Sequence, residues 1–265
     1  MKIGFSGEAL GRKYPFDKIC DIATKYNLTT CEIWPHNVEG EGHGYKNKDL
    51  KKIKDIATNK GVTIECVTFA CPSSIGSETY SKLFCDAIEK AAGIGALRMN
   101  HYCGSLCPNE ADFNVMEQFW SEPLKTAEKN GIILALENEA HDATRTPDRM
   151  LKIINHFNSK NFKTNLDVTN YYEGGTDGFP NAYETLKEHI GYVHLKNAHR
   201  YPDGFRWVQI PDGVVHVSAL VLKIAQEGTY TGLCSLEPHV QPDEVESYFK
   251  RESKYLFDVL KDYIK

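Results

Sequence analysis

The chain alternates between two hydrophobic patterns along its whole length. Short apolar runs rich in β-branched and aromatic residues predict β-strands, and most of them follow a glycine or a polar turn. Between these runs, apolar residues recur every three or four positions, which predicts amphipathic helices. The strands are expected at residues 2–6, 30–34, 63–69, 96–101, 132–137, 162–167, 192–196 and 233–237.

Several of the helical patterns are marked by their ends. One pattern stops at Gly61 and another at Gly228, where a glycine suits the left-handed residue that follows a helix. A third begins with Pro147, and proline is well tolerated in the first turn. The clearest helices are therefore expected at residues 16–27, 50–61, 147–157 and 217–228.

Eight strand–helix units in 265 residues give roughly 33 residues per unit, which is the size of a βαβ motif. No linker, low-complexity tract or change of composition marks a domain boundary. We therefore predict one domain over residues 1–265 with the α/β fold of a closed (β/α)8 TIM barrel. A doubly wound open sheet is the alternative, but no G-x-G-x-x-G follows the first strand.

Composition narrows the class of protein. The chain is 41% hydrophobic and 25% charged, with a net charge of -5. Neither a nucleic-acid partner nor a membrane surface is therefore expected. Its first residues lack the apolar core of a signal peptide, and no apolar run is long enough to span a bilayer. Most of the eight cysteines lie in apolar runs and are read as reduced core residues of a cytoplasmic protein.

Charged residues stand at the ends of four consecutive predicted strands. Glu137, Asp167 and Glu237 close strands five, six and eight, and His194 lies near the end of strand seven. In a barrel these side chains would surround one point, and three carboxylates meeting there need a cation. A lone glutamate after a strand is usually solvated, and a lone histidine usually belongs to the core. Four together favour a site for one divalent ion, Mn²⁺, Mg²⁺, Co²⁺ or Zn²⁺.

The segments around these residues are "LALEN", "NLDVTN", "YVHLKNAHR" and "GLCSLEPHV". They resemble the signature segments of the sugar isomerase/epimerase group of xylose-isomerase-like TIM barrels, and the resemblance extends over nearly the whole chain. It implies that Glu137, Asp167, His194 and Glu237 bind one divalent metal, with Mn²⁺ the first expectation. It also implies that Glu137 and Glu237 act as an acid/base pair on opposite faces of the substrate.

The resemblance also implies contacts to the substrate. Arg200 matches an arginine that contacts substrate oxygens in this group. Residues 194–204 look like the corresponding loop of epimerases that act on keto-sugars and 3-keto-glycosides, which makes His199 a further candidate. Ketose epimerases carry a histidine where this chain has Asn170, so the exact substrate stays open. The abasic-site nucleases of the superfamily need more histidines than this chain offers, and an acidic chain gives DNA no basic groove.

Other polar and aromatic residues near strand ends are expected to line the pocket. Aromatic rings suit the apolar faces of a sugar, whereas histidines and lysines suit its hydroxyl groups. Ordinary packing at the barrel rim is the alternative for each of them, and Glu139 is read as a supporting or solvated residue. The candidates for substrate contact are Trp34, His101, His141 and Lys196.

These residues predict proton transfer next to a carbonyl group, with a metal-stabilised enediolate as the intermediate. The first hypothesis is a metal-dependent epimerase or isomerase of a keto-sugar or 3-keto-glycoside. The second is a lyase or dehydratase on a keto-sugar, 3-keto-glycoside or keto-inositol, which His141 would favour as an acid for the leaving group. The third is a metal-bound sugar-binding protein without turnover. The only partner expected is a small sugar, and the sequence leaves a homo-oligomer open.

Overall fold

A computed structural model describes residues 1–8 and 15–263 of the chain. Eight parallel strands close into a barrel in the order β1-β10-β7-β6-β5-β4-β3-β2, so each strand pairs with its neighbour in the predicted series. The prediction of a (β/α)8 barrel is confirmed. The barrel strands are β1 (Lys2–Ser6), β2 (Thr30–Ile33), β3 (Thr63–Thr68), β4 (Arg98–Tyr102), β5 (Ile133–Glu137), β6 (Phe162–Leu166), β7 (Ile190–Leu195) and β10 (Leu233–Leu236).

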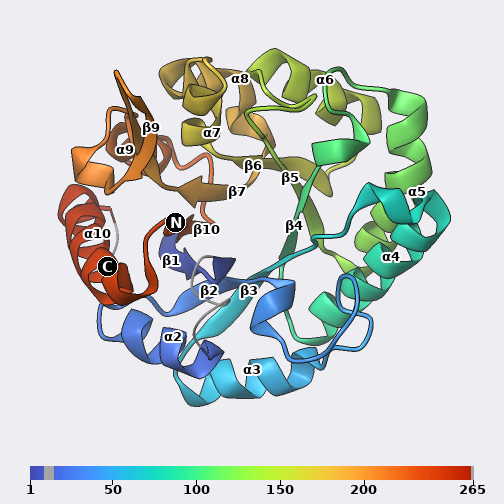
Figure 1. The fold of residues 1–265 in the computed structure, drawn as a ribbon, viewed down its shortest axis with the longest axis horizontal. Coiled ribbons are helices and arrows are strands. Elements are labelled where there is room, and N and C mark those ends of the chain that lie inside the picture. Colours follow the sequence, from blue (N-terminus) through green and yellow to red (C-terminus); the bar gives the residue numbers. More distant parts are fainter. Residues whose placement is uncertain (9–14, 264–265) are drawn as a thin grey trace.

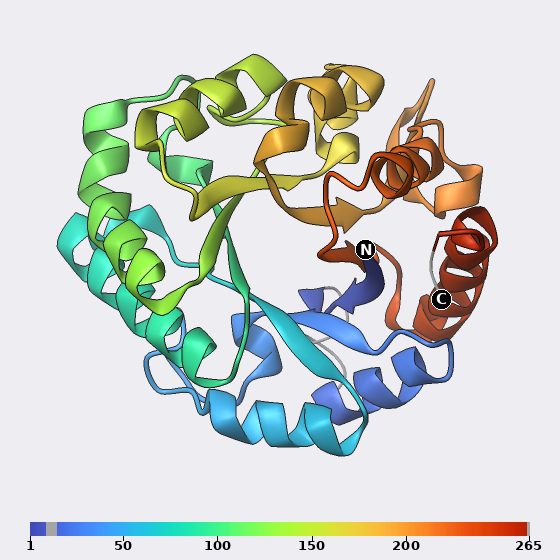
Figure 2. The ribbon, with the colours of Figure 1, turned by 180° about the vertical axis from the view of Figure 1, so that it is seen from behind.

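The helices form a ring around the strands, and the view from behind shows the same arrangement (Figures 1 and 2). Their apolar faces pack against the outer surface of the barrel, which removes them from water. None of the described helices is both long enough and apolar enough to cross a membrane. The α-helices of the described residues are α2 (Phe16–Thr24), α3 (Leu50–Asn59), α4 (Ser77–Gly93), α5 (Phe113–Asn130), α6 (Pro147–Phe157), α7 (Val168–Glu173), α8 (Tyr183–Leu186), α9 (Val217–Glu227) and α10 (Val245–Leu260).

The barrel interior is lined by every second residue of each strand, because successive side chains of a strand point to opposite faces. A small apolar cluster of Cys66, Ala135, Tyr192 and Leu233 lies inside. Two residues further along three of these strands are Thr68, Glu137 and His194, so the lining becomes polar toward the carboxyl ends of the strands.

A β-hairpin that the hydrophobic pattern did not predict follows β7. It pairs β8 (Asn197–Tyr201) with β9 (Gly204–Val208) in antiparallel register, outside the barrel sheet (Figure 1). Its turn has the sequence Tyr-Pro-Asp-Gly, and Gly204 has a φ of 143°. Glycine adopts this backbone conformation without strain. Proline, aspartate and glycine together favour a turn, so the sequence contained a local signal for the turn of this hairpin.

The end of this hairpin is fixed to helix α10 by a buried carboxyl group. Glu252 Oε1 accepts a hydrogen bond from the backbone N–H of Ile210 at 2.9 Å, just after β9. Glu252 Oε2 is buried without a hydrogen-bond partner among the described residues. Burial raises the pKa of Glu252 to about 7, and the nearby Asp212 adds to this while Arg251 opposes it.

This raised pKa predicts a measurable pH dependence of stability. Between the ordinary pKa of 4.5 and about 7, the folded chain holds a proton on Glu252 that the unfolded chain releases. The free energy of unfolding therefore falls as pH rises through this window. The amide of Glu252→Gln does not titrate, so the variant lacks this pH-dependent loss of stability. Denaturant titrations at several pH values should show the variant gaining stability over wild type with rising pH, by roughly 2–3 kcal/mol across the window.

The matched control is Glu89→Gln at an exposed position of α4, which should follow the wild-type pH dependence. A constant difference between Glu252→Gln and wild type at all pH values would show that Glu252 titrates normally.

Candidate metal centre

The structure brings the four predicted ligands together at the carboxyl ends of their strands. One ligand atom from each of Glu137, Asp167, His194 and Glu237 lies within 4.8 Å of the others. None of these four residues is more than 3% exposed. Glu137 ends β5, His194 lies in β7, and Asp167 and Glu237 directly follow β6 and β10. Parallel strands in a closed barrel all end on one side, so residues far apart in sequence meet there.

Asp167 caps a helix with one carboxylate oxygen and directs the other into the cluster. Its Oδ1 caps helix α7 by accepting hydrogen bonds from the backbone N–H groups of Thr169 at 2.8 Å and Asn170 at 3.0 Å. Such a cap satisfies N–H groups of the first turn, and it leaves Oδ2 for the cluster. Oδ2 has no hydrogen-bond partner within the described chain, although the Lys196 ammonium lies 2.9 Å away. A buried carboxylate oxygen in this state is suited to a cation.

Side-chain amides hold Glu137 in place. Its Oε2 accepts hydrogen bonds from Asn100 Nδ2 at 2.8 Å and Asn165 Nδ2 at 3.1 Å. Its Oε1 accepts one from Asn170 Nδ2 at 3.3 Å and lies 3.0 Å from His194 Nδ1. Asn170, which stands where ketose epimerases carry a histidine, therefore contacts two of the candidate ligands.

His194 lies between two groups of carboxylates. Its Nδ1 is 3.0 Å from Glu137 Oε1 and 3.6 Å from Glu237 Oε2, and its Nε2 is 3.0 Å from Glu32 Oε2. Burial acts to lower the pKa of the imidazole, but the carboxylates of Glu137, Glu237 and Glu32 outweigh it and raise the pKa well above its ordinary value.

Lys196 supplies a buried positive charge. Its Nζ donates to Glu237 Oε2 at 2.6 Å and lies over the Trp207 ring, 5.0 Å from the ring centre. Burial acts to lower the pKa of Lys196, but Asp167 and Glu237 raise it well above its ordinary value, so the side chain stays charged. For Glu237, burial acts to raise the pKa, and Lys196 with His194 lowers it well below its ordinary value.

The charges of the cluster fit a divalent cation. Glu32, Glu137, Asp167 and Glu237 carry four negative charges, and Lys196 compensates for one of them. Two negative charges remain when His194 is protonated, and three remain when it is neutral, as a metal ligand must be, at a cost of several kcal/mol for each uncompensated buried ion. Oxygen and imidazole donors in this number suit Mn²⁺, Mg²⁺, Co²⁺ or Zn²⁺. The residues present therefore fit a divalent ion.

Three supporting residues of the centre were missed in the sequence. Glu32, Asn100 and Asn165 are fully buried inside the barrel, in the middle or near the end of β2, β4 and β6. The available signal for Glu32 was a charged residue inside a largely apolar strand, "TCEIW", whereas Asn100 and Asn165 lie in strands that contain other polar residues. Such a residue needs buried partners, which marks it as part of a polar network.

His101 does not reach the centre, in contrast to the expectation that it contacts substrate. It alternates on β4 with Asn100 and Tyr102, so its side chain points to the outer face of the sheet. There it is fully buried, with its ring centre 5.3 Å from that of Phe84 and 5.1 Å from that of Trp120. Burial in this apolar environment lowers its pKa to about 3, and neither ring nitrogen has a hydrogen-bond partner among the described residues.

The remaining candidates lie at the rim. His141 is exposed, 3.7 Å from Glu173. Arg200 is also exposed, lies on hairpin strand β8 over the Phe205 ring and donates to the backbone carbonyl of Glu173 at 3.1 Å. His199 is half-buried and stacks on Tyr201. Among the described contacts, His141 and Arg200 meet at Glu173, and none of the three residues joins the four residues of the cluster.

Trp34 is buried beside the centre. Its Nε1 donates to Ser6 Oγ at 3.0 Å and to Glu32 Oε2 at 3.2 Å, and its ring lies 5.8 Å from that of Tyr102. His36 lies 6.0 Å from the same ring, and a contact between Trp34 and substrate stays a prediction.

Two cavities adjoin the centre. One of about 330 Å³ contains Lys196 and Glu237 and is walled by Trp207 and His239, whose ring centres stack at 4.4 Å. The other, of about 380 Å³, lies between the loops after β4 and β5. It is lined by Tyr102, Gly104, Ser105, Pro108, Glu139, His141 and Asp142.

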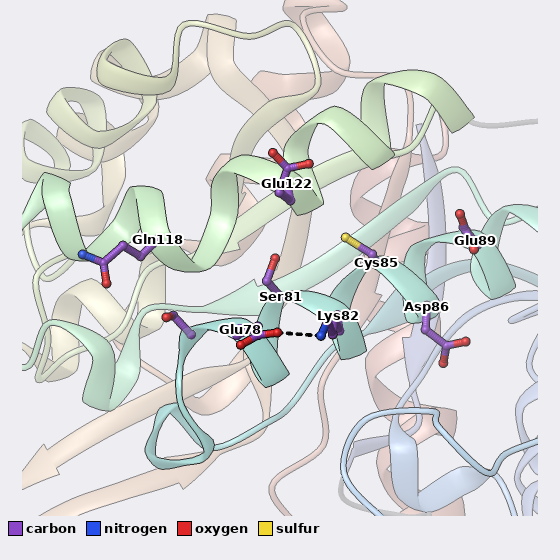
Figure 3. Close-up of a pocket in the computed structure, with 9 residues that line it drawn as sticks. Glu78, Ser81, Lys82, Cys85, Asp86, Glu89, Gln118 and Glu122 are labelled. Atoms are coloured by element: carbon purple, nitrogen blue, oxygen red, sulfur yellow. Dashed lines mark hydrogen bonds and ion pairs between the residues drawn. The ribbon is translucent and has the colours of Figure 1, made fainter.

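A larger groove of about 600 Å³ lies elsewhere, between the outer faces of α4 and α5 (Figure 3). Four of its nine lining residues are acidic, and Glu78 pairs with Lys82 at 2.7 Å. It contains none of the four residues of the cluster, so the candidate centre lies apart from it, beside the two smaller cavities.

The chain matches a known protein family and resembles several solved structures in fold. The family model described as xylose isomerase-like TIM barrel matches residues 20–259. No curated protein matches the chain. Solved structures of similar fold include an L-ribulose 3-epimerase, at 14% identity and a TM-score of 0.78 over 99% of this chain and 95% of that one.

Two further structures share the fold. An IolI protein with a bound zinc atom is 17% identical, with a TM-score of 0.76 over 100% of both chains. A mannonate dehydratase from Streptococcus suis serotype 2 is 12% identical, with a TM-score of 0.77 over 99% of this chain and 95% of that one. Identities this low establish the shared fold and leave the reaction to be argued from the site.

The cluster predicts that a divalent ion stabilises the folded chain. Mn²⁺ or Co²⁺ added to chelator-treated protein should raise the unfolding temperature, because an ion that binds only the folded state adds about 2.7 kcal/mol at 100 times its Kd. Asp167→Asn should lose most of this shift while its amide oxygen still caps α7. Thermal unfolding with and without the ion measures both effects.

Asp148→Asn, at an exposed position in the first turn of α6, is the matched control and should keep the full shift. An equal shift in Asp167→Asn and wild type would place the bound ion away from this cluster.

Proposed function

The chain belongs to the xylose isomerase-like TIM barrel family, and we propose that it is a divalent-metal-dependent epimerase or isomerase of a keto-sugar or 3-keto-glycoside. The observation that carries the proposal is the pair of buried carboxylates, Glu137 and Glu237, in one cluster with Asp167 and His194. Strands β6 and β7 separate the strands of the two glutamates, so their carboxylates approach the site from different sides.

We assign the ion to Glu137, Asp167, His194 and Glu237, with Mn²⁺ as the first candidate. When bound, it supplies a Lewis acid that lowers the cost of negative charge on a substrate carbonyl oxygen. The protein supplies the proton transfers. One of the two glutamates removes the proton from the carbon next to the carbonyl, and the other returns a proton from the other side. Return to the same carbon gives an epimer, and return to the neighbouring carbon gives an aldose–ketose isomer.

Substrate contacts are assigned to residues of the barrel mouth. Lys196 holds a charged Nζ in the cavity beside Glu237, where it can donate to a sugar hydroxyl or carbonyl oxygen. Trp207 and His239 give this cavity an aromatic wall that suits the apolar face of a sugar ring. Arg200 and His199 lie on the adjacent hairpin and would contact the part of the substrate that points outward. The L-ribulose 3-epimerase of similar fold agrees with this substrate class.

A lyase or dehydratase on a related substrate is the second candidate, and the cavity near Glu139 favours it. Glu139 lines this cavity with His141 and Tyr102, close to Glu137 in the chain. Burial, followed by the charge of Glu137, raises the pKa of Glu139 well above its ordinary value. A protonated group in this place could give its proton to a departing hydroxyl or glycosidic oxygen. The mannonate dehydratase of similar fold is by name an enzyme of this reaction type.

Solvent exchange tests the proposal. The protein is incubated in D₂O with Mn²⁺ or Co²⁺ and a panel of free keto-sugars and 3-keto-glycosides, and proton NMR follows deuterium incorporation and products. Wild type should introduce deuterium next to the carbonyl. Glu137→Gln and Glu237→Gln should each slow this by about 10²–10⁴-fold at saturating metal, because each removes one proton-transfer group.

Glu89→Gln is the control for the substitution itself and should exchange at the wild-type rate. An epimer or isomer as product supports the first reaction, whereas release of water or an aglycone supports the lyase. Ligand binding with no exchange in any substrate would reduce the chain to a metal-bound sugar-binding protein and contradict both enzymatic proposals.

A further inference from the structure

We propose that Glu32 is a positioning residue that keeps the proton of His194 on Nε2, so that Nδ1 is the nitrogen that faces a bound metal. This inference rests on the proposed function, because it concerns the same centre. It adds a residue from β2, on a strand that carries none of the four ligands.

The first step concerns the charge state of Glu32. Its Oε2 accepts a hydrogen bond from the indole N–H of Trp34 at 3.2 Å. An indole nitrogen can only donate, so this carboxylate oxygen must be an acceptor. The hydroxyl groups of Ser6 and Thr68 donate to Oε2 and Oε1 respectively, each at 2.5 Å. These donors come from β1, from β3 and from the residue that follows β2, and they stabilise Glu32 as a fully buried carboxylate.

The second step concerns the two nitrogens of His194. Nε2 lies 3.0 Å from Glu32 Oε2, which already accepts hydrogen bonds from Trp34 and Ser6, so we place a hydrogen on Nε2. A neutral imidazole has one N–H, and its lone pair is then on Nδ1. Nδ1 faces carboxylate oxygens of Glu137 and Glu237 at 3.0 and 3.6 Å. Without an ion, a second proton on Nδ1 would satisfy these carboxylates, and a metal bound at Nδ1 would take the place of that proton.

The third step concerns the direction of the ring. Glu32 and His194 are 162 positions apart, and their strands are separated by β1 and β10 in the barrel. The contact therefore crosses the barrel interior and fixes the imidazole from the side opposite to the ligands. The Tyr192 ring packs edge-on against the imidazole, with 4.9 Å between the ring centres. Together these contacts restrict rotation of the ring and define which nitrogen meets the ion.

Zn²⁺ is the probe for the test because it is diamagnetic and suits imidazole ligands. Its affinity is measured by competition with a chromophoric chelator, and ¹⁵N NMR of histidine-labelled protein reports which His194 nitrogen is protonated. The His194 signals are those that disappear in His194→Asn. Wild type should show a protonated Nε2 and a zinc-bound Nδ1. Glu32→Met should lose the protected Nε2–H and bind Zn²⁺ about 10–100-fold more weakly.

Two variants separate positioning from general destabilisation. Glu32→Gln places an amide oxygen where the carboxylate oxygen was, and this oxygen can accept a hydrogen bond from Nε2. The variant should therefore retain the Nε2–H and most of the Zn²⁺ affinity that Glu32→Met loses. Glu65→Met removes another buried carboxylate, which pairs with Arg98 at 2.9 Å and forms no ion pair with His194 among the described residues. This control should bind Zn²⁺ as wild type does.

The outcomes distinguish the two proposals. Zinc bound through Nε2 of wild-type His194, or equal affinity in Glu32→Met and Glu65→Met, would overturn the role of Glu32 and leave the four-ligand centre standing. Absence of Zn²⁺ and Mn²⁺ binding in wild type would overturn both proposals. If Glu32→Met does not fold, the wild-type spectrum and the Zn²⁺ affinity of Glu32→Gln still decide the question. A tenfold or greater loss of Zn²⁺ affinity in Glu32→Gln, with the Nε2–H retained, would contradict positioning through this hydrogen bond.

Discussion

The constraint on which the site depends is the burial of four carboxylates inside one barrel. Like charges at these distances repel strongly where water is excluded, and each would become protonated unless positive charge or hydrogen-bond donors surrounded it. Two kinds of side chain stabilise these carboxylates. Amides and hydroxyls hold the carboxylates of Glu137 and Glu32, while Lys196 lies between Asp167 and Glu237. The arrangement still leaves an excess of negative charge, which a divalent ion would balance.

The barrel makes this concentration of charge possible through the period of two along each strand. An outward residue packs against helices and an inward residue meets the strands opposite, so neighbouring positions have different environments. Asn100 and His101 show the contrast. The amide of Asn100 donates to Glu137, whereas His101, one residue later, is enclosed by aromatic rings of the outer layer. The apolar packing that stabilises the fold and the polar network that forms the site are therefore interleaved along one strand.

This period also explains how much could be predicted from the sequence. The strand–helix alternation predicted the barrel, and polar residues at the ends of four apolar runs predicted the ligand cluster. Glu32 was missed because it lies inside a strand, and its partner His194 is distant in sequence. His101 was misplaced because a strand's inward face cannot be assigned from one run without knowing the register. The exposed hairpin was signalled only by the residues of its turn, and the hydrophobic periodicity of helices and strands does not report such residues.

The separation between cluster and rim accounts for the variety of reactions attached to this fold. In the proposed reaction the buried cluster supplies one step, removal of a proton beside a carbonyl, and its contacts leave it little freedom to vary. The fate of the resulting intermediate depends on which protonated groups and which sugar contacts surround it. In this chain those groups lie on loops and on the hairpin: Lys196 and Trp207 on one side, Glu139 and His141 on the other. Loops on a barrel can change without disturbing the strands, so a change of reaction requires no change in the carboxylates that the strands hold.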